Sequence, residues 1–93
     1  MAEERPNVSP NVNVRVRYFA ALIDLAGRHE ESLVLVGGDA TIADVWTQVI
    51  ALHPALHAQR PSVRVACNTD FVKDDARVAE GDVVALLPPF SGG

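Results

Sequence analysis

The sequence is poor in the residues that build several kinds of site. Its 93 residues include one cysteine, Cys67, and one lysine, Lys73. A single thiol excludes an intrachain disulfide framework and suits a reducing compartment, so we expect a cytoplasmic protein. The longest apolar runs, residues 19–23 and 83–87, are far shorter than the roughly 20 residues of a membrane-spanning helix, and residues 1–10 lack a signal-peptide pattern.

The charge balance argues against a nucleic-acid partner. The chain has eight basic and twelve acidic residues, its net charge is −4 at pH 7, and no stretch is rich in lysine or arginine. Nucleic-acid binding depends on clustered positive charge. We therefore expect neither a nucleic-acid nor a membrane partner.

What is present is enough for one small folded domain. Apolar residues make up 48% of the chain and charged residues 22%, the usual range for globular proteins. Residues 1–11 combine proline, asparagine and charge without periodicity, which predicts a flexible N-terminal lead-in. Residues 12–88 are predicted to form the domain, and residues 89–93 an extended C-terminal tail that ends in Gly-Gly.

Alternation of apolar and polar residues predicts the strands. It is clearest in residues 12–19, where Val12, Val14, Val16 and Tyr18 share one side. Shorter patterns predict strands at residues 33–36, 63–67 and 83–87, and the sequence NTDFV, residues 68–72, predicts a tight turn into a short strand. Two prolines follow residue 87, and because proline cannot continue a sheet ladder, the chain should leave the domain there.

Residues 41–53 are predicted to be the main helix. Thr41 and Asp44 have the spacing of a capping box, and Pro54 forces His53 out of the helical region. A short helical turn after the first strand should end at Gly27 in a left-handed conformation. One face of the main helix is apolar and should cover the sheet, with the stripe Ile42, Val45, Trp46, Val49 and Ile50.

The order of elements predicts the fold class. It reads strand, strand, helix, strand, short strand, strand. Such an order describes an α+β roll in which one main helix packs across a mixed sheet. This is the layout of the β-grasp, or ubiquitin-like, fold.

Four stretches of the sequence resemble a known family. RYFAALIDLAG, TIADVWTQVIALHP, VRVACNTDFV and EGDVVALLPPFSGG are similar, in order and in register, to the MoaD family, the small sulfur carrier subunits of molybdopterin synthase. The resemblance covers residues 12–93. Its most specific part is the ending, which has two prolines, an apolar residue, a small residue and two glycines.

The resemblance implies a function that depends on the last residue. In this family the carboxylate of the C-terminal glycine, here Gly93, is adenylated by a MoeB-like enzyme of the ubiquitin-activating type and then converted to a thiocarboxylate with sulfur from a donor. The carrier then docks on a MoaE-like large subunit, in a heterotetramer, and gives its sulfur to a pterin precursor of the molybdenum cofactor. The chain should therefore be non-catalytic alone and bind no cofactor, because the ATP is used by the activating enzyme.

The residue types of the tail suit insertion into a partner. Residues 88–93 reach ~20 Å when extended. Pro88 and Pro89 keep the base of the tail extended, and the glycines fit a narrow passage. Gly93 is thus the predicted reactive residue, and the residues predicted to occupy the partner's channel are Pro88, Pro89, Phe90, Ser91 and Gly92.

Two other groups of residues invite a chemical interpretation that we do not favour. His53 and His57 are four positions apart, but Pro54 interrupts the helical turn that would bring them together, so no metal site is predicted. Cys67 lies in an alternating strand and is predicted to be a small buried residue rather than a nucleophile. Trp46 is expected in the core.

The remaining basic residues are expected to be exposed to solvent. Lys73 is predicted to be a solvated loop residue. Arg15, Arg17 and Arg64 should share the outer face of the sheet if the strand registers hold.

Two alternative functions remain open. The first is sulfur carriage to another product, such as thiamine or cysteine, or attachment to lysines as a protein modifier. The second is a ubiquitin-like interaction domain with no chemistry at its end. Removal of Gly93 separates them, because an interaction domain should keep its activity and a carrier should lose it.

Overall fold

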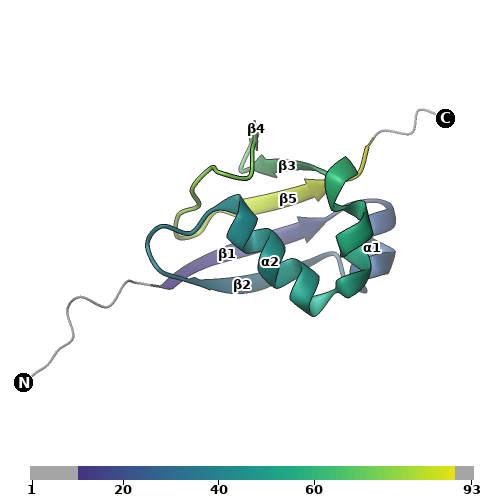
Figure 1. Cartoon of the computed structure of the whole chain (residues 1–93), viewed down its shortest axis with the longest axis horizontal. Coiled ribbons are helices and arrows are strands. Elements are labelled where there is room, and N and C mark those ends of the chain that lie inside the picture. Colours follow the sequence, from purple (N-terminus) through teal and green to yellow (C-terminus); the bar gives the residue numbers. More distant parts are fainter. Residues whose placement is uncertain (1–10, 90–93) are drawn as a thin grey trace, which may run out of the picture.

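The computed structural model describes residues 11–89 of the protein. These residues form one five-stranded mixed sheet, in the order β2-β1-β5-β3-β4, with helix α2 across one of its faces (Figure 1). The predicted α+β roll is therefore confirmed.

The strands agree with the predicted order and differ mainly at their ends. They are β1 (Asn11–Tyr18), β2 (Glu30–Val36), β3 (Arg64–Cys67), β4 (Asp70–Val72) and β5 (Val83–Leu87). β1 and β2 form an antiparallel hairpin, β5 runs parallel to β1, and β3 is antiparallel to both β5 and β4. β2 begins three residues earlier than the alternation predicted, because its polar first residues continue the pairing with β1.

The main helix is confirmed with its cap. α2 (Ile42–Leu52) is followed by His53 as its C-cap, and the carboxylate of Asp44 accepts hydrogen bonds from the backbone N–H of Thr41 at 2.9 Å and from its hydroxyl at 3.2 Å. The short helix α1 (Ala21–Ala26) ends, as predicted, at Gly27 with φ of 76°.

A second helical segment lies between residues 53 and 63, where no helix was predicted. Residues after α2 form the 3-10 helix η1 (Pro54–Ser62), which has prolines at its first position and near its end. Short 3-10 turns fit proline-bearing connections that an α-helix does not tolerate. None of the helices within residues 11–89 has the length and apolar content that a membrane crossing requires.

One face of the sheet and the helices enclose the core. The inward side chains of β1 are all buried, and those of the central strand β5, Val84 and Leu86, are fully enclosed. Trp46 of α2 is 1% exposed, which confirms its predicted place in the core. The predicted helix stripe is buried except for Ile50, which is only partly covered. The fully enclosed side chains are those of Trp46, Tyr18, Leu22, Leu35, Ile42, Leu56, Leu86, Val16, Val45, Val49 and Val84.

The opposite face of the sheet carries no helix in the described part of the chain (Figure 1). The registers place Arg15 beside Val83, and Arg64 beside Leu87, on this outer face. Arg17 lies two residues further along β1, so the predicted sharing of one face by the three arginines is confirmed.

Candidate functional site

The predicted tail is attached to the central strand of the sheet. β5 pairs with β1 on one side, from Arg15 beside Val83 to Tyr18 beside Leu86, and with β3 on the other. A central strand with both edges paired and its inward side chains enclosed is among the parts of a fold that open least readily. The base of the tail is therefore held by a strand that is hydrogen-bonded along both of its edges.

The start of β5 is fixed by the turn that precedes β4. Asn68 adopts a left-handed conformation with φ of 59°. Its backbone N–H donates to the carbonyl of Val83 at 2.7 Å, and its side-chain oxygen accepts from the N–H of Val83 at 3.1 Å. Asparagine tolerates this conformation better than most residues, so this choice of residue helps to set the register of β5.

β5 ends at Leu87, directly before the two prolines. Pro88 and Pro89 are the last described residues, and Pro89 is exposed. Phe90, Ser91, Gly92 and Gly93 lie outside the described residues, so their predicted roles stay predictions.

The outer face of the sheet is apolar beside the base of the tail. Val83, Ala85 and Leu87 of β5 are partly exposed there. Phe71 of β4 is 59% exposed, and the Arg64 guanidinium lies 4.0 Å from the centre of its ring. An exposed apolar group of this kind beside a predicted reactive end is typical of a surface that contacts another protein.

The other two outward arginines are paired with an acid on the neighbouring strand. Arg15 lies 2.6 Å, and Arg17 3.6 Å, from the carboxylate of Glu30. Arg17 is also 5.5 Å from the centre of the Phe19 ring. These pairs are half exposed and contribute little to stability.

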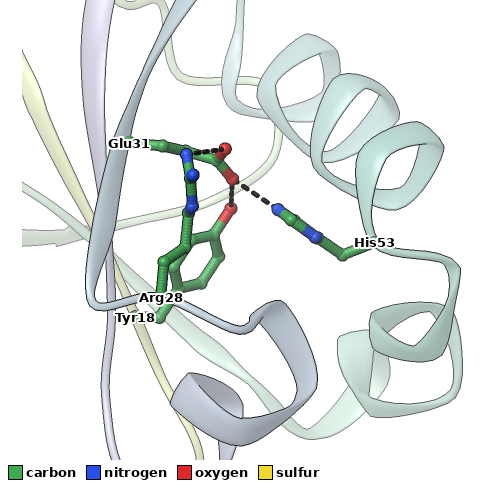
Figure 2. A network of polar contacts seen from close by, with 4 residues as sticks. All are labelled: Tyr18, Arg28, Glu31 and His53. Carbon is green, nitrogen blue, oxygen red and sulfur yellow. Dashed lines mark hydrogen bonds and ion pairs between the residues drawn. The ribbon is translucent and has the colours of Figure 1, made fainter.

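An inward-facing carboxylate joins three elements near the base of the tail. Glu31 of β2 accepts a hydrogen bond from the hydroxyl of Tyr18, at the end of β1, and one of 2.6 Å from Nε2 of His53, which caps α2 (Figure 2). Arg28 donates to the other carboxylate oxygen at 3.1 Å. Tyr18 of β1 pairs with Leu86 of β5, two residues before Pro88. This cluster therefore fixes the end of β1 beside the base of the tail.

The pKa values of the cluster follow from its contacts. Burial alone would raise the pKa of Glu31, but the hydrogen bonds from Tyr18 and His53, with the charges of His53 and Arg28, together lower it below its ordinary value. Burial and the bond to the Glu31 carboxylate raise the pKa of Tyr18. Glu31 is therefore an anion, and Tyr18 a neutral donor, over the neutral pH range.

Sequence reasoning missed Glu31. The residue is 22 positions from His53 and belongs to a strand whose predicted start was Leu33. A signal was present, because the alternation of Leu35 and Leu33 continues backwards to Glu31 and places this acid on the inner face, where a charged residue needs partners.

The other residues singled out from the sequence lie apart from this cluster. His57 is exposed in η1, away from the contact that His53 makes with Glu31. Lys73 is exposed in the loop after β4, as predicted. Cys67 was predicted to be buried, but it is only partly covered, because it ends β3 next to the turn. Its thiol donates to Asp82 at 3.3 Å, and burial together with this carboxylate raises the pKa of Cys67 to about 11, so it is a poor nucleophile.

Known proteins resemble this chain over most of its length. The molybdopterin synthase sulfur carrier subunit of Chlamydomonas reinhardtii is 37% identical over 84 residues, which are 88% of this chain and 100% of that protein. Small archaeal modifier protein 1 of Haloferax volcanii is 33% identical over 83% of this chain and 97% of its own length. The crystal structure of the Haloferax protein has a TM-score of 0.79 at 30% identity, over 87% of this chain and 99% of that chain, and this confirms the β-grasp fold.

A second solved structure shares the fold. It is the complex of subunits 1 and 2 of the molybdopterin-converting factor from Helicobacter pylori, in which the matching chain is 23% identical, with a TM-score of 0.61 over 88% of this chain and 100% of that chain. Residues 16–93 match the ThiS family. This match, with a relative at 37% identity along its whole length, shows that the chain belongs to the ThiS family.

Proposed function

We propose that this chain is the sulfur carrier subunit of molybdopterin synthase. Gly93 receives the sulfur as a thiocarboxylate and donates it to a pterin precursor in molybdenum cofactor biosynthesis. The chain has no catalytic activity alone and binds no cofactor of its own. It acts in the cytoplasm, a reducing compartment that suits its free thiol, Cys67.

One observation carries the proposal. The family match runs through the central strand β5 and onward to Gly93, so the part of the chain that resembles a carrier includes the predicted reactive end. The strand is firmly bonded on both sides, and two prolines follow it at once. A rigid base and a short extended tail can place one terminal carboxylate at a defined depth in a partner protein.

The chemistry requires activation because a free carboxylate is a poor electrophile. An oxygen of the Gly93 carboxylate attacks the α-phosphorus of ATP, and pyrophosphate leaves. A hydrosulfide ion from the sulfur donor then attacks the carbonyl carbon, AMP leaves with the original oxygen, and the new S–H group loses its proton to solvent. The result is a carboxylate in which one oxygen has been replaced by sulfur.

Two partners follow from this sequence of steps. The first is a MoeB-like adenylating enzyme, which binds the ATP. The second is a MoaE-like large subunit, and the Helicobacter pylori complex of subunits 1 and 2 supports a partner of this kind. The apolar outer face around Leu87 and Phe71 is the surface of this chain best placed to contact either of them.

Intact-mass spectrometry tests the proposal. The protein is incubated with ATP, a sulfur donor and the matching adenylating enzyme, and we expect a mass increase equal to the exchange of one oxygen for sulfur, located at Gly93 by fragmentation. The gain should require ATP and disappear when Gly93 is deleted.

A glycine elsewhere provides the matched control. Gly38→Ala should accept sulfur normally, since a Cβ at Gly38 meets no atom within 4 Å and its φ is not positive. An unmodified Gly93 in the presence of a demonstrably active enzyme would refute the carrier function.

A second candidate function is protein modification. The likeness to small archaeal modifier protein 1 favours it. In that case the activated Gly93 carboxyl would form an amide with a lysine of another protein, and larger conjugates would accumulate in cells. Conjugates that need Gly93 would support this function, whereas synthesis of molybdopterin from the thiocarboxylate and the large subunit would support the first.

A further inference from the structure

A groove near the point where the tail leaves the sheet has no role in the sulfur chemistry described above. Its walls come from the start of β3 and the end of β4, and its volume is about 360 Å³. This volume is at the lower end of the range for small-ligand sites. The groove lies at the edge of the sheet, because β4 is an edge strand. Its main lining residues are Val63, Arg64, Val65, Phe71, Val72 and Lys73.

The charges of the groove favour an anion. Arg64 and Lys73 contribute two positive charges and Asp74 one negative charge. The Asp74 carboxylate is bound by Arg60 at 2.9 Å. Within residues 11–89 neither Arg64 nor Lys73 forms an ion pair.

The apolar wall favours an aromatic or aliphatic group next to that anion. Phe71 is 59% exposed, and Val72 lies beside it. The guanidinium of Arg64 lies over the Phe71 ring, so the cation and the apolar surface are adjacent. A ligand that fits both has an apolar side chain within a few residues of a carboxylate.

The tail is long enough to reach the groove. Leu87 pairs with Arg64, and Val65 pairs with Val72, so the end of β5 is two strand spacings from β4. Two spacings amount to about 10 Å. Residues 88–93 span up to ~20 Å when extended, which leaves room for a turn across β3.

The composition of the tail matches what the groove selects. Phe90 supplies the apolar group, and Gly93 supplies a carboxylate. Ser91 and Gly92 join them without bulky side chains that would oppose a bend.

We propose that the groove binds residues 90–93 of the same chain, with Phe90 against Phe71 and the terminal carboxylate at Arg64 and Lys73. The reactive end is then held against its own sheet edge until a partner displaces it. This inference goes beyond sulfur carriage and depends on the proposed function only in taking Gly93 as the terminal residue. Binding within one chain is favoured because a short tether keeps its end at a millimolar effective concentration, so a contact too weak to form between molecules is still populated.

The test compares ¹H–¹⁵N NMR spectra of the full chain with those of a variant that ends at Pro89. Amide shifts at Phe71, Val72 and Lys73 are the readout, because these residues are two strands away from the deletion. We expect these amide shifts to differ between the two proteins. The size of the difference should be the same at low and at high protein concentration. Phe90→Ser in the full chain, which changes no described residue, should reproduce part of the difference.

Charge-reversal variants locate the site. In a full chain carrying Arg64→Glu and Lys73→Glu, the deletion should no longer change the β4 amide shifts. Arg77→Glu is the control, because it reverses one positive charge in the same way and its side chain is 73% exposed outside the groove, 3.7 Å from Asp39. This control should keep the effect of the deletion.

Three results would overturn the proposal. The deletion could leave the β4 amides unchanged, or its effect could persist in the doubly reversed variant. Shifts that grow with protein concentration would instead assign the groove to the tail of a second copy. None of these spectra requires ATP or a sulfur donor. The contact between the tail and the groove can therefore be refuted while thiocarboxylate formation at Gly93 is confirmed, and the contact can be confirmed while thiocarboxylate formation is refuted.

Discussion

Replacement of Glu31 with glutamine should destabilise the fold strongly. The Glu31 side chain is 8% exposed and accepts hydrogen bonds from Tyr18, His53 and Arg28. Glutamine keeps the shape but loses the charge, and its amide group brings a donor against the donors that surround it. Hydrogen bonds to a charged group contribute about 1.5–3 kcal/mol each and are not additive, so we expect the free energy of unfolding to fall by about 2–4 kcal/mol. For a domain of this size the Tm should fall by at least about 8 °C.

The neighbouring acid provides the control. Glu30 has a 41% exposed side chain and pairs with Arg15 and Arg17 on the outer face. Glu30→Gln removes the same charge, but from a solvated pair, so the loss should stay below about 1 kcal/mol.

The effect of Glu31 should depend on pH. Because the folded state lowers the pKa of Glu31, the stability that this carboxylate contributes is fully present above its ordinary value of 4.5 and is lost as the pH falls through the lower folded-state pKa. The Glu31→Gln variant should therefore lose less stability than the natural chain over this acidic range. At the alkaline end the raised pKa of Tyr18 predicts that stability falls above about pH 10, where tyrosine ionises in the unfolded chain but not in the folded one.

Urea unfolding, followed by the fluorescence of the single tryptophan, Trp46, measures these changes. Trp46 is 1% exposed, so its emission reports the opening of the core. A double-mutant cycle with Tyr18→Phe isolates the contact between Tyr18 and Glu31, and a coupling of at least about 1 kcal/mol is expected. A coupling near zero, or equal effects of Glu31→Gln and Glu30→Gln, would refute the reasoning.

Three further outcomes follow from single contacts. Leu86→Ala removes a fully enclosed side chain of β5 and should lower the free energy of unfolding by about 2–5 kcal/mol in the same urea assay; a loss below about 1 kcal/mol would contradict the packing. Asp44→Ala removes the carboxylate that binds Thr41 and should cost about 1 kcal/mol, with reduced helical ellipticity before unfolding. Alkylation of Cys67 at about pH 8 should be roughly a hundredfold slower than that of a free cysteine, and Asp82→Asn should speed it; a rate equal to that of free cysteine would show that Asp82 and burial do not raise the pKa.

The sequence was sufficient for the fold because the dominant signals are local. Alternation along β1 and the apolar stripe of α2 each follow from one element packing against one face. The start of β2 was missed for the opposite reason, since Glu30 and Ser32 extend only because β1 lies beside them. The 3-10 helix η1 was missed because two prolines remove the α-helical pattern without specifying what replaces it.

The candidate site was predictable only where it is continuous in the chain. The prolines, Phe90 and the glycines follow one another closely, so their pattern can be recognised from the order of residues alone. The Glu31 cluster and the groove beside Phe71 are assembled from separate elements, and they depend on strand registers that no single stretch encodes. Composition did correctly exclude an intrachain disulfide, but it could not show that the thiol of Cys67 contacts Asp82.

The attachment of the tail to a central strand limits where a partner can place its active site. The end of β5 does not readily separate from the sheet to lengthen the tail, because Val84 and Leu86 are fully enclosed and both edges of the strand are paired. Gly93 can therefore move no further than about 20 Å from the end of the sheet. A partner that receives the proposed thiocarboxylate must then contact the body of the domain and hold Gly93 at the same time, so substitutions at Leu87 or Phe71 on the outer face should weaken sulfur transfer without changing the chemistry at Gly93.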